Sequence, residues 1–197
     1  MGSTPYAGVS GTGVTFRVWA PNATSVAVRG SFNGYSSTAN FLVKEAGGLG
    51  LWSGDIPTAR AGDQYKYYLS GSLWKRDPRG RKVVNSSDNT IIYDPNAFNW
   101  AGDTRLSVNT SNLVIYEMHV GAFYDSTPSS GGPGKFADAI TKLDHLVDLG
   151  INAVELMPIM EFAGDNSWGY NPADPYAVEN TGYGGPDGLK SFVKAAH

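Results

Sequence analysis

The sequence predicts a β-sandwich followed by a segment of alternating strands and helices. Residues 11–95 contain short runs of alternating apolar and polar residues separated by Gly, Pro, Asn and Asp, which is typical of an antiparallel sandwich. After Leu113 apolar runs alternate with helical periodicity, which indicates a parallel sheet with crossover helices. We therefore expect a sandwich over residues 1–95, a linker over 96–112 and a β/α segment over 113–197.

The front strands are expected where the apolar residues alternate. Val14, Phe16 and Val18 recur at every second position, as in a half-buried strand. A second alternating run covers residues 25–29, and the Asn33-Gly34 pair behind it predicts a turn, because both residues tolerate positive φ. The remaining strands are expected over Leu51–Ile56, Gln64–Leu69 and residues 90–93.

The back half begins with residues 113–118, a nearly continuous apolar run of the kind found in strands buried on both faces. A single helix is expected behind it, ending at Gly150. Residues 151–157 predict a second buried strand, and after a long loop Pro186 opens another helix. The apolar residues at helical spacing are Phe136, Ile140, Leu143 and Val147 in the first helix, and Leu189, Phe192, Val193 and Ala196 in the second.

Composition excludes several classes of protein. The 197 residues are 41% hydrophobic and 17% charged with a net charge of -3, and no Lys/Arg-rich run exists to meet a phosphate backbone, so we expect no nucleic-acid partner. No apolar run approaches the ~20 residues of a membrane span. Cysteine is absent, so no thiolate site forms. The start, residues 1–5, shows no signal peptide, which favours a cytoplasmic location without settling it.

Four segments of the back half match a known family in order. They are residues 114–123 (VIYEMHVGAF), 149–159 (LGINAVELMPI), 168–172 (WGYNP) and 183–187 (YGGPD). These segments resemble the α-amylase superfamily, glycoside hydrolase family 13. Within that superfamily their residues are most similar to those of branching enzymes and maltooligosyltrehalose trehalohydrolases. The resemblance implies that residues 113–197 are the first two β/α units of a TIM-type catalytic barrel, cut short.

The front half resembles the usual companion of these enzymes, a carbohydrate-binding module of family 48. The likeness lies in residues 16–21 (FRVWAP), 30–35 (GSFNGY), 65–67 (YKY) and 74–78 (WKRDP). It implies an immunoglobulin-like sandwich of the early set. Carried over by motif, the family's surface site would comprise Tyr35, Lys66, Trp74 and Asn89, with Tyr35 in place of a Trp common in glycogen binders. Whether this module binds glucan or only packs stays open, because aromatic residues in sheets are most often core.

The superfamily resemblance implies an enzyme that acts on starch, glycogen or maltooligosaccharides with retention. Retention needs two carboxyl groups roughly 5–5.5 Å apart, and in the family these follow later barrel strands than the two present here. We therefore assign no catalytic residue and expect the chain alone to be inactive. Tyr170 matches the tyrosine that stacks under the sugar ring beside the scissile bond, and Asn171 and Asp174 are expected to line the same groove.

Other acidic and imidazole side chains have simpler interpretations. Glu117, Glu155 and Glu161 lie on or just after the buried strands, and Glu117 with His119 is expected to form an inward-facing, mutually hydrogen-bonded pair rather than an acid–base couple. His119, His145 and His197 lack metal-ligand spacing, so no metal or cofactor is expected.

Two functions remain open. The first is the N-terminal fragment of an α-glucan-processing enzyme, with branching, hydrolysis and trehalose release undistinguished. The second is a non-catalytic glucan-binding or scaffold protein that acts through the sandwich. In either case the bare edges of a two-stranded parallel sheet predict self-association.

Overall fold

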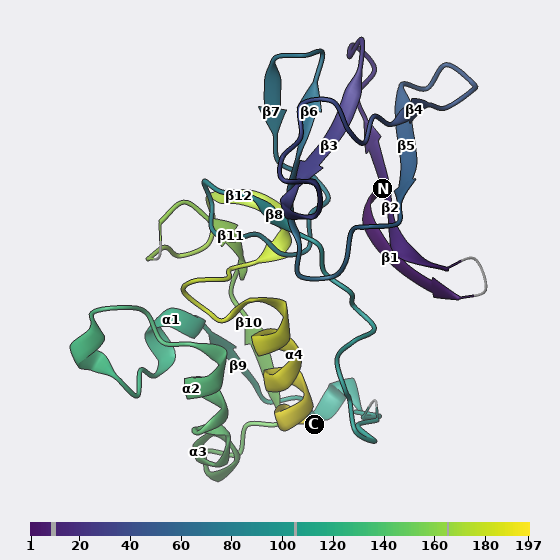
Figure 1. Ribbon diagram of the computed structural model, residues 1–197. Coiled ribbons are helices and arrows are strands. Elements are labelled where there is room, and N and C mark those ends of the chain that lie inside the picture. Colours follow the sequence, from purple (N-terminus) through teal and green to yellow (C-terminus); the bar gives the residue numbers. More distant parts are fainter. Residues whose placement is uncertain (9–10, 105, 165) are drawn as a thin grey trace. The chain divides into compact units, whose positions relative to one another are not determined.

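The computed structural model describes residues 1–8, 11–104, 106–164 and 166–197. The chain divides into two compact units, Met1–Pro95 and Asn96–His197 (Figure 1). Each unit has its own buried apolar cluster.

The first unit consists of two antiparallel sheets. One sheet has the order β1-β2-β5-β4, formed by β1 (Gly2–Gly8), β2 (Gly11–Trp19), β5 (Leu51–Ile56) and β4 (Val43–Lys44). The other has the order β3-β6-β7, formed by β3 (Val26–Gly30), β6 (Gln64–Leu69) and β7 (Leu73–Lys75), and β8 (Thr90–Ile91) also pairs with β6. The predicted antiparallel sandwich is confirmed.

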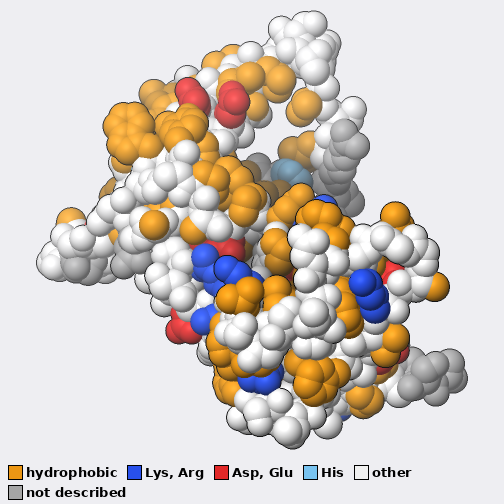
Figure 2. Space-filling model, turned by 90° about the horizontal axis from the view of Figure 1, so that it is seen from above, with side chains coloured by type: hydrophobic (Ala, Val, Ile, Leu, Met, Phe, Trp, Pro, Cys, Tyr) orange, Lys and Arg blue, Asp and Glu red, His pale blue; other side chains and the backbone are white. Residues whose placement is uncertain are grey.

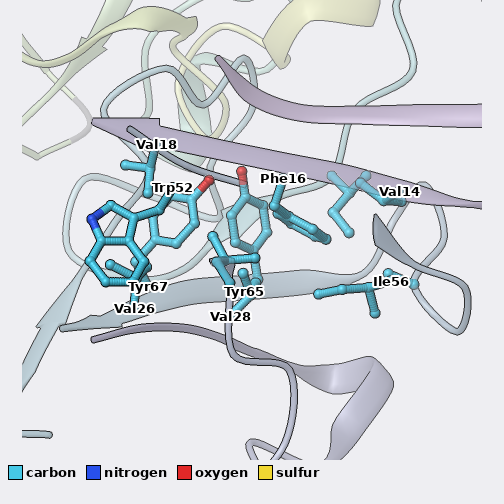
Figure 3. Packing of buried hydrophobic residues seen from close by; sticks show 12 residues of the cluster. Val14, Phe16, Val18, Val26, Val28, Trp52, Ile56, Tyr65 and Tyr67 are labelled. Atoms are coloured by element: carbon cyan, nitrogen blue, oxygen red, sulfur yellow. The ribbon is translucent and has the colours of Figure 1, made fainter. Parts of the chain in front are cut away.

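Alternation along the strands places the core between the two sheets. Val14, Phe16 and Val18 of β2 are buried together with Tyr65 and Tyr67 of β6, and their side chains meet in the space between the strands (Figure 3). The intervening residues of each strand point away from this core, because successive side chains of a strand face opposite sides. The β3–β6–β7 sheet therefore has an outer face whose side chains do not pack into the core between the two sheets.

Three segments of the first unit, β1, β4 and β7, were not anticipated as strands. β4 is two residues long and pairs with Trp52 and Ser53 of β5. β1 contains Gly, Ser, Thr and Pro without an apolar alternation, and it forms because all seven of its residues pair in register with β2. β7 is only three residues long and pairs with Tyr67, Tyr68 and Leu69 of β6. All three strands owe their conformation to a neighbouring strand rather than to their own pattern.

A short helical turn follows β3. This turn, η1 (Ser31–Asn33), ends at Gly34 with φ 58°, as expected for the Asn-Gly signal. The side chain of Asn33 bonds back to the end of β3 twice: its Oδ1 accepts from the Gly30 amide at 3.0 Å and its Nδ2 donates to the Val28 carbonyl at 3.0 Å. These bonds hold the backbone of the turn that leads to Tyr35, whose φ is 57°.

The second unit contains a parallel strand pair and a separate hairpin. β9 (Ile115–Met118) and β10 (Ala153–Leu156) pair in parallel, and β11 (Met160–Phe162) and β12 (Pro172–Val178) pair antiparallel. Between and after them lie the helical segments η2 (Thr110–Asn112), α1 (Val120–Phe123), η3 (Pro128–Ser130), α2 (Phe136–Ile140), α3 (Leu143–Asp148) and α4 (Gly185–Ala196). Strand, helix, strand and helix thus follow in the expected order.

Three details of the second unit differ from the expectation. The single helix ending at Gly150 is two segments, α2 and α3. Between them the amides of Thr141 and Lys142 bond the carbonyls three residues back at 3.1 and 3.0 Å, instead of continuing the α-helical pattern of bonds four residues back. Val147 of α3 is 68% exposed. The run 113–118 is covered on one face only, since Ile115 is 54% exposed. The long loop after β10 contains the β11–β12 hairpin.

The core of the second unit is rich in aromatic side chains. Tyr183 contacts Phe136 and Phe162 edge-on, with ring centroids 6.2 and 5.6 Å apart, and Phe192 of α4 packs on Phe136 at 5.9 Å. These contacts attach α4 and α2 to each other. In the part of the chain that the structure describes, no helix is both long and apolar enough to cross a bilayer.

Candidate functional site

The four residues predicted for the first unit lie on the outer face of the β3–β6–β7 sheet. Because Tyr65 and Tyr67 of β6 enter the core, the alternate residues Gln64, Lys66 and Tyr68 face outward. Trp74 of β7 is the register partner of Tyr68. We call this surface, with Tyr35, Lys66, Tyr68, Trp74 and Asn89 as its members, the aromatic face.

Two exposed rings dominate the aromatic face. Tyr35 is 37% exposed and Trp74 45%, and their ring centroids lie 6.5 Å apart with an interplanar angle of 51°. Trp74 in turn packs on Tyr68 at 5.0 Å. The two accessible rings are therefore close enough to contact neighbouring units of one ligand, and they are tilted rather than coplanar.

Polar groups border the rings and fix their orientation. The side-chain amide of Asn89 donates to the Tyr35 hydroxyl at 3.0 Å and to Oε1 of Gln64 at 2.9 Å. Partial burial raises the pKa of Tyr35, and the carboxylates of Asp88 and Asp63 add to that rise, so its hydroxyl stays protonated at neutral pH and remains a donor. Lys66 stands between Gln64 and Tyr68 on the same strand face. Flat rings beside amide, hydroxyl and ammonium groups suit a polyhydroxyl ligand with apolar ring faces.

Arg29 lies under the same surface, although no sequence motif pointed to it. It is buried beneath the rings, 7% exposed, with its guanidinium carbon 3.4 Å from the centroid of the Tyr68 ring and 5.1 Å from that of Trp74. The signal available in the sequence was a cation in the middle of an otherwise small and apolar strand, residues 26–30.

The second unit places its predicted residues differently. Tyr170 is 68% exposed in the loop between β11 and β12. Asn171 is exposed beside it, and its side-chain oxygen accepts from the Ser167 hydroxyl at 2.5 Å. Asp174 is buried within β12, with Glu161 of β11 as its register partner. Tyr170 and Asn171 therefore share an accessible surface, while Asp174 lies inside the hairpin.

A hollow of about 300 Å³ lies beneath this loop. His119 contacts the Ser167 carbonyl at 2.9 Å through Nε2, and the hydroxyl of Tyr183 lies 3.2 Å from the same nitrogen. Burial raises the pKa of Tyr183 to about 12, and the neighbouring Glu179 contributes. These contacts attach the loop that carries Trp168 and Tyr170 to the core of the unit.

The expected pair of Glu117 and His119 does not form. β9 ends at Met118, and His119 is the N-cap of α1, so strand alternation does not extend to its side chain. Glu117 is exposed and lies opposite Glu155 in the parallel register. Glu161 is buried and accepts a hydrogen bond from the Asn180 amide at 3.0 Å.

Charge and metal-binding groups are sparse at both locations. Across residues 1–8, 11–104, 106–164 and 166–197, no cluster of three or more His, Asp or Glu side chains could hold a metal ion. On the face drawn in Figure 2, Lys and Arg side chains form small separate groups among apolar ones.

Comparison with known proteins places both halves. Residues 1–97 match the family model of carbohydrate-binding module 48, the isoamylase N-terminal domain. The chain is 35% identical over 188 residues to a malto-oligosyltrehalose trehalohydrolase of Saccharolobus solfataricus, covering 94% of this chain and 30% of the relative. It is 32% identical over 201 residues to a 1,4-alpha-glucan branching enzyme of Halothermothrix orenii, covering 94% of this chain and 31% of the relative.

A solved structure from Salmonella typhimurium, described as a presumed alpha amylase, superposes with a TM-score of 0.82 at 29% identity. The match covers 100% of this chain and 31% of that one. The chain thus spans about 30% of the length of these proteins. The resemblance to the α-amylase superfamily and its family 48 module is confirmed.

Proposed function

Because the front unit is a module of carbohydrate-binding family 48 and the chain is similar to glucan branching enzymes and a trehalohydrolase, we propose that it is the N-terminal part of an enzyme acting on α-glucans. Its ligands are starch, glycogen or maltooligosaccharides. The observation that supports this most is the aromatic face, where Tyr35 and Trp74 lie 6.5 Å apart beside the Asn89 amide.

The shape of the aromatic face favours a curved glucan. Pyranose rings present apolar C–H faces to aromatic rings, and their hydroxyls exchange hydrogen bonds with amide and ammonium groups. An α-1,4-linked chain turns at each linkage, whereas a β-1,4-linked chain is flat. The 51° tilt between Tyr35 and Trp74 suits the turning chain, so we propose α-glucans as the ligand class.

The second unit contributes the first two β/α units of a catalytic barrel in this proposal. Its parallel β9–β10 pair with intervening helices supports that assignment. Catalytic residues of barrel enzymes follow the carboxyl ends of strands, and Tyr170 stands in the loop region after β10. We propose that Tyr170 stacks on a sugar ring there, that Asn171 contacts its hydroxyls, and that Asp174 supports the hairpin from inside.

Catalysis itself is not assigned to any residue of this chain. A retaining reaction requires a nucleophilic carboxylate and an acid–base carboxyl group about 5–5.5 Å apart, and in the family these follow later barrel strands. We propose that the present chain binds glucan without cleaving it. Among the described residues β9 pairs with β10 alone, and we propose that its other edge accepts a further strand or a second copy of the chain.

Affinity electrophoresis of the full 197-residue chain in glycogen-containing gels tests the proposed ligand. We expect retardation that Trp74→Ala reduces by about an order of magnitude, since stacking on an exposed aromatic ring is worth about 1–3 kcal/mol, as for nucleic-acid bases. Trp19→Ala is the matched control, because Trp19 is also exposed but belongs to the other sheet. Equal mobility of wild type and Trp74→Ala in glycogen would remove the proposal.

A further inference from the structure

Arg29 is a buried cation without a carboxylate partner among the described residues. Its one hydrogen bond runs from Nη2 to the Ser37 carbonyl at 2.9 Å, and Nε is buried with no hydrogen-bond partner in the same set of residues. Burying a charge is costly unless it is paired. A buried arginine without a carboxylate partner therefore indicates that its guanidinium group has a role that a neutral side chain would not fill.

The strand register makes the choice of a cation at this position more unusual. Arg29 of β3 is the direct cross-strand partner of Lys66 of β6, and like charges directly opposite each other destabilise an antiparallel pair. The compensation comes from aromatic rings, because the guanidinium lies over the face of Tyr68 at 3.4 Å and near that of Trp74 at 5.1 Å. Cation–π contacts of this kind strengthen when they are desolvated.

The same guanidinium reaches the segment that carries the other exposed ring. Ser37 follows Tyr35 by two residues, and Tyr35 has a left-handed backbone with φ 57°, a conformation that needs support from its surroundings. One side chain therefore contacts Tyr68 and Trp74 on two strands and the segment after Tyr35. No other described side chain of the aromatic face makes all three contacts.

We propose that Arg29 is the positioning residue of the aromatic face, holding Trp74 and the Tyr35 segment at the spacing and tilt that an α-glucan contacts. This role rests on the proposed function. Arg29 itself does not touch the ligand, because it is buried under the rings. Lysine cannot replace it, since an ammonium group lacks the planar surface that stacks on Tyr68 and the fork that reaches Ser37.

Calorimetric titration of the full chain with maltoheptaose tests this role. For Arg29→Lys we expect the Kd to rise about tenfold, on the order of one desolvated cation–π contact, and the near-UV circular dichroism of the stacked Tyr68 and Trp74 rings to decrease. Arg17→Lys is the matched control, since Arg17 is an exposed arginine of the other sheet. It should change neither signal.

Two outcomes separate this role from the proposed function. If Trp74→Ala weakens binding while Arg29→Lys binds as tightly as wild type with an unchanged near-UV spectrum, the positioning role is wrong and glucan binding stands. If neither wild type nor Trp74→Ala binds maltoheptaose, the glucan assignment fails and the role fails with it. A far-UV spectrum and melting temperature of Arg29→Lys close to wild type exclude unfolding as the cause of weaker binding.

Discussion

Asp77 is the buried acid of the first unit, and two tyrosines share one of its oxygens. The hydroxyls of Tyr65 and Tyr67 donate to Oδ2 at 2.5 and 3.3 Å, and both rings point their hydroxyls the same way (Figure 3). The Arg79 amide donates to Oδ1 at 2.8 Å. Burial raises the pKa of Asp77, and these hydrogen bonds oppose the rise. The module thus stabilises a charged group inside its core with donors from β6.

Replacing Tyr65 tests how much these hydrogen bonds contribute to the free energy of unfolding. Tyr65→Phe should lower the free energy of unfolding by about 1.5–3 kcal/mol at pH 7, because a buried acceptor loses its shortest charge-assisted bond. Tyr67→Phe, which removes the longer bond, is the matched control and should cost less. Urea denaturation followed by circular dichroism measures both.

The pH dependence of this effect has a definite sign. The folded-state pKa of Asp77 lies above its unfolded value, so the group contributes stability that is present below the unfolded pKa and lost as pH rises through the folded pKa. Tyr65→Phe raises the folded pKa further, since the lost bond favoured the charged form. The variant should therefore lose more stability at pH 7 than at pH 4, and equal losses at both would contradict this account.

The β3–β6 pair sets the aromatic face at the scale of elements. At Gly30, the register partner of Tyr65, an added Cβ would lie 2.4 Å from the Gln64 carbonyl oxygen. Backbone cannot move aside as a flexible side chain can. The glycine therefore permits the close approach of β3 to β6 that places Gln64 against Asn89.

Gly30→Ala should lower the free energy of unfolding by about 3 kcal/mol or more, as overpacking against backbone does. Gly71→Ala is the control: its φ is 74° but nothing lies within 4 Å of an added Cβ, so only the backbone strain of about 1–2 kcal/mol applies. Thermal melts and urea titrations compare the two. A loss at Gly30 no larger than that at Gly71 would show that the strands separate without cost.

Sequence patterns predicted some elements and not others for physical reasons. β2, β5 and β6 were predicted because their own residues alternate between core and surface. β1, β4 and β7 were missed because pairing with a neighbour decides their conformation. α2 and α3 were expected as one helix because periodicity does not register the three-residue backbone bonds at Thr141 and Lys142. The β11–β12 hairpin was hidden in a segment rich in Gly, Pro and Asp.

The candidate site shows the same division between motif and packing. Tyr35, Lys66, Trp74 and Asn89 were selected by resemblance, and the structure gathers them on one sheet face. Arg29 was missed because its importance depends on Tyr68 and Trp74, which reach it from two other strands. Likewise, the sequence placed Glu117 beside His119, whereas the end of β9 separates them.

At the scale of the molecule, the chain joins a unit that matches the family model of carbohydrate-binding module 48 to a unit similar to part of amylase-type enzymes, and it spans about 30% of the length of its relatives. We propose that the aromatic face binds glucan. This binding belongs to the first unit alone and depends on side chains that are exposed in the described structure. It can therefore be measured with this chain.

An NMR titration of the 197-residue chain with maltoheptaose tests whether the aromatic face binds an α-glucan. We expect progressive shifts of the Trp74 indole N–H and the Asn89 side-chain amide, with the Trp19 indole N–H unchanged, and no such shifts with a β-1,4-linked oligosaccharide of equal length. Unchanged Trp74 and Asn89 signals at millimolar maltoheptaose, or shifts confined to Trp19, would contradict it.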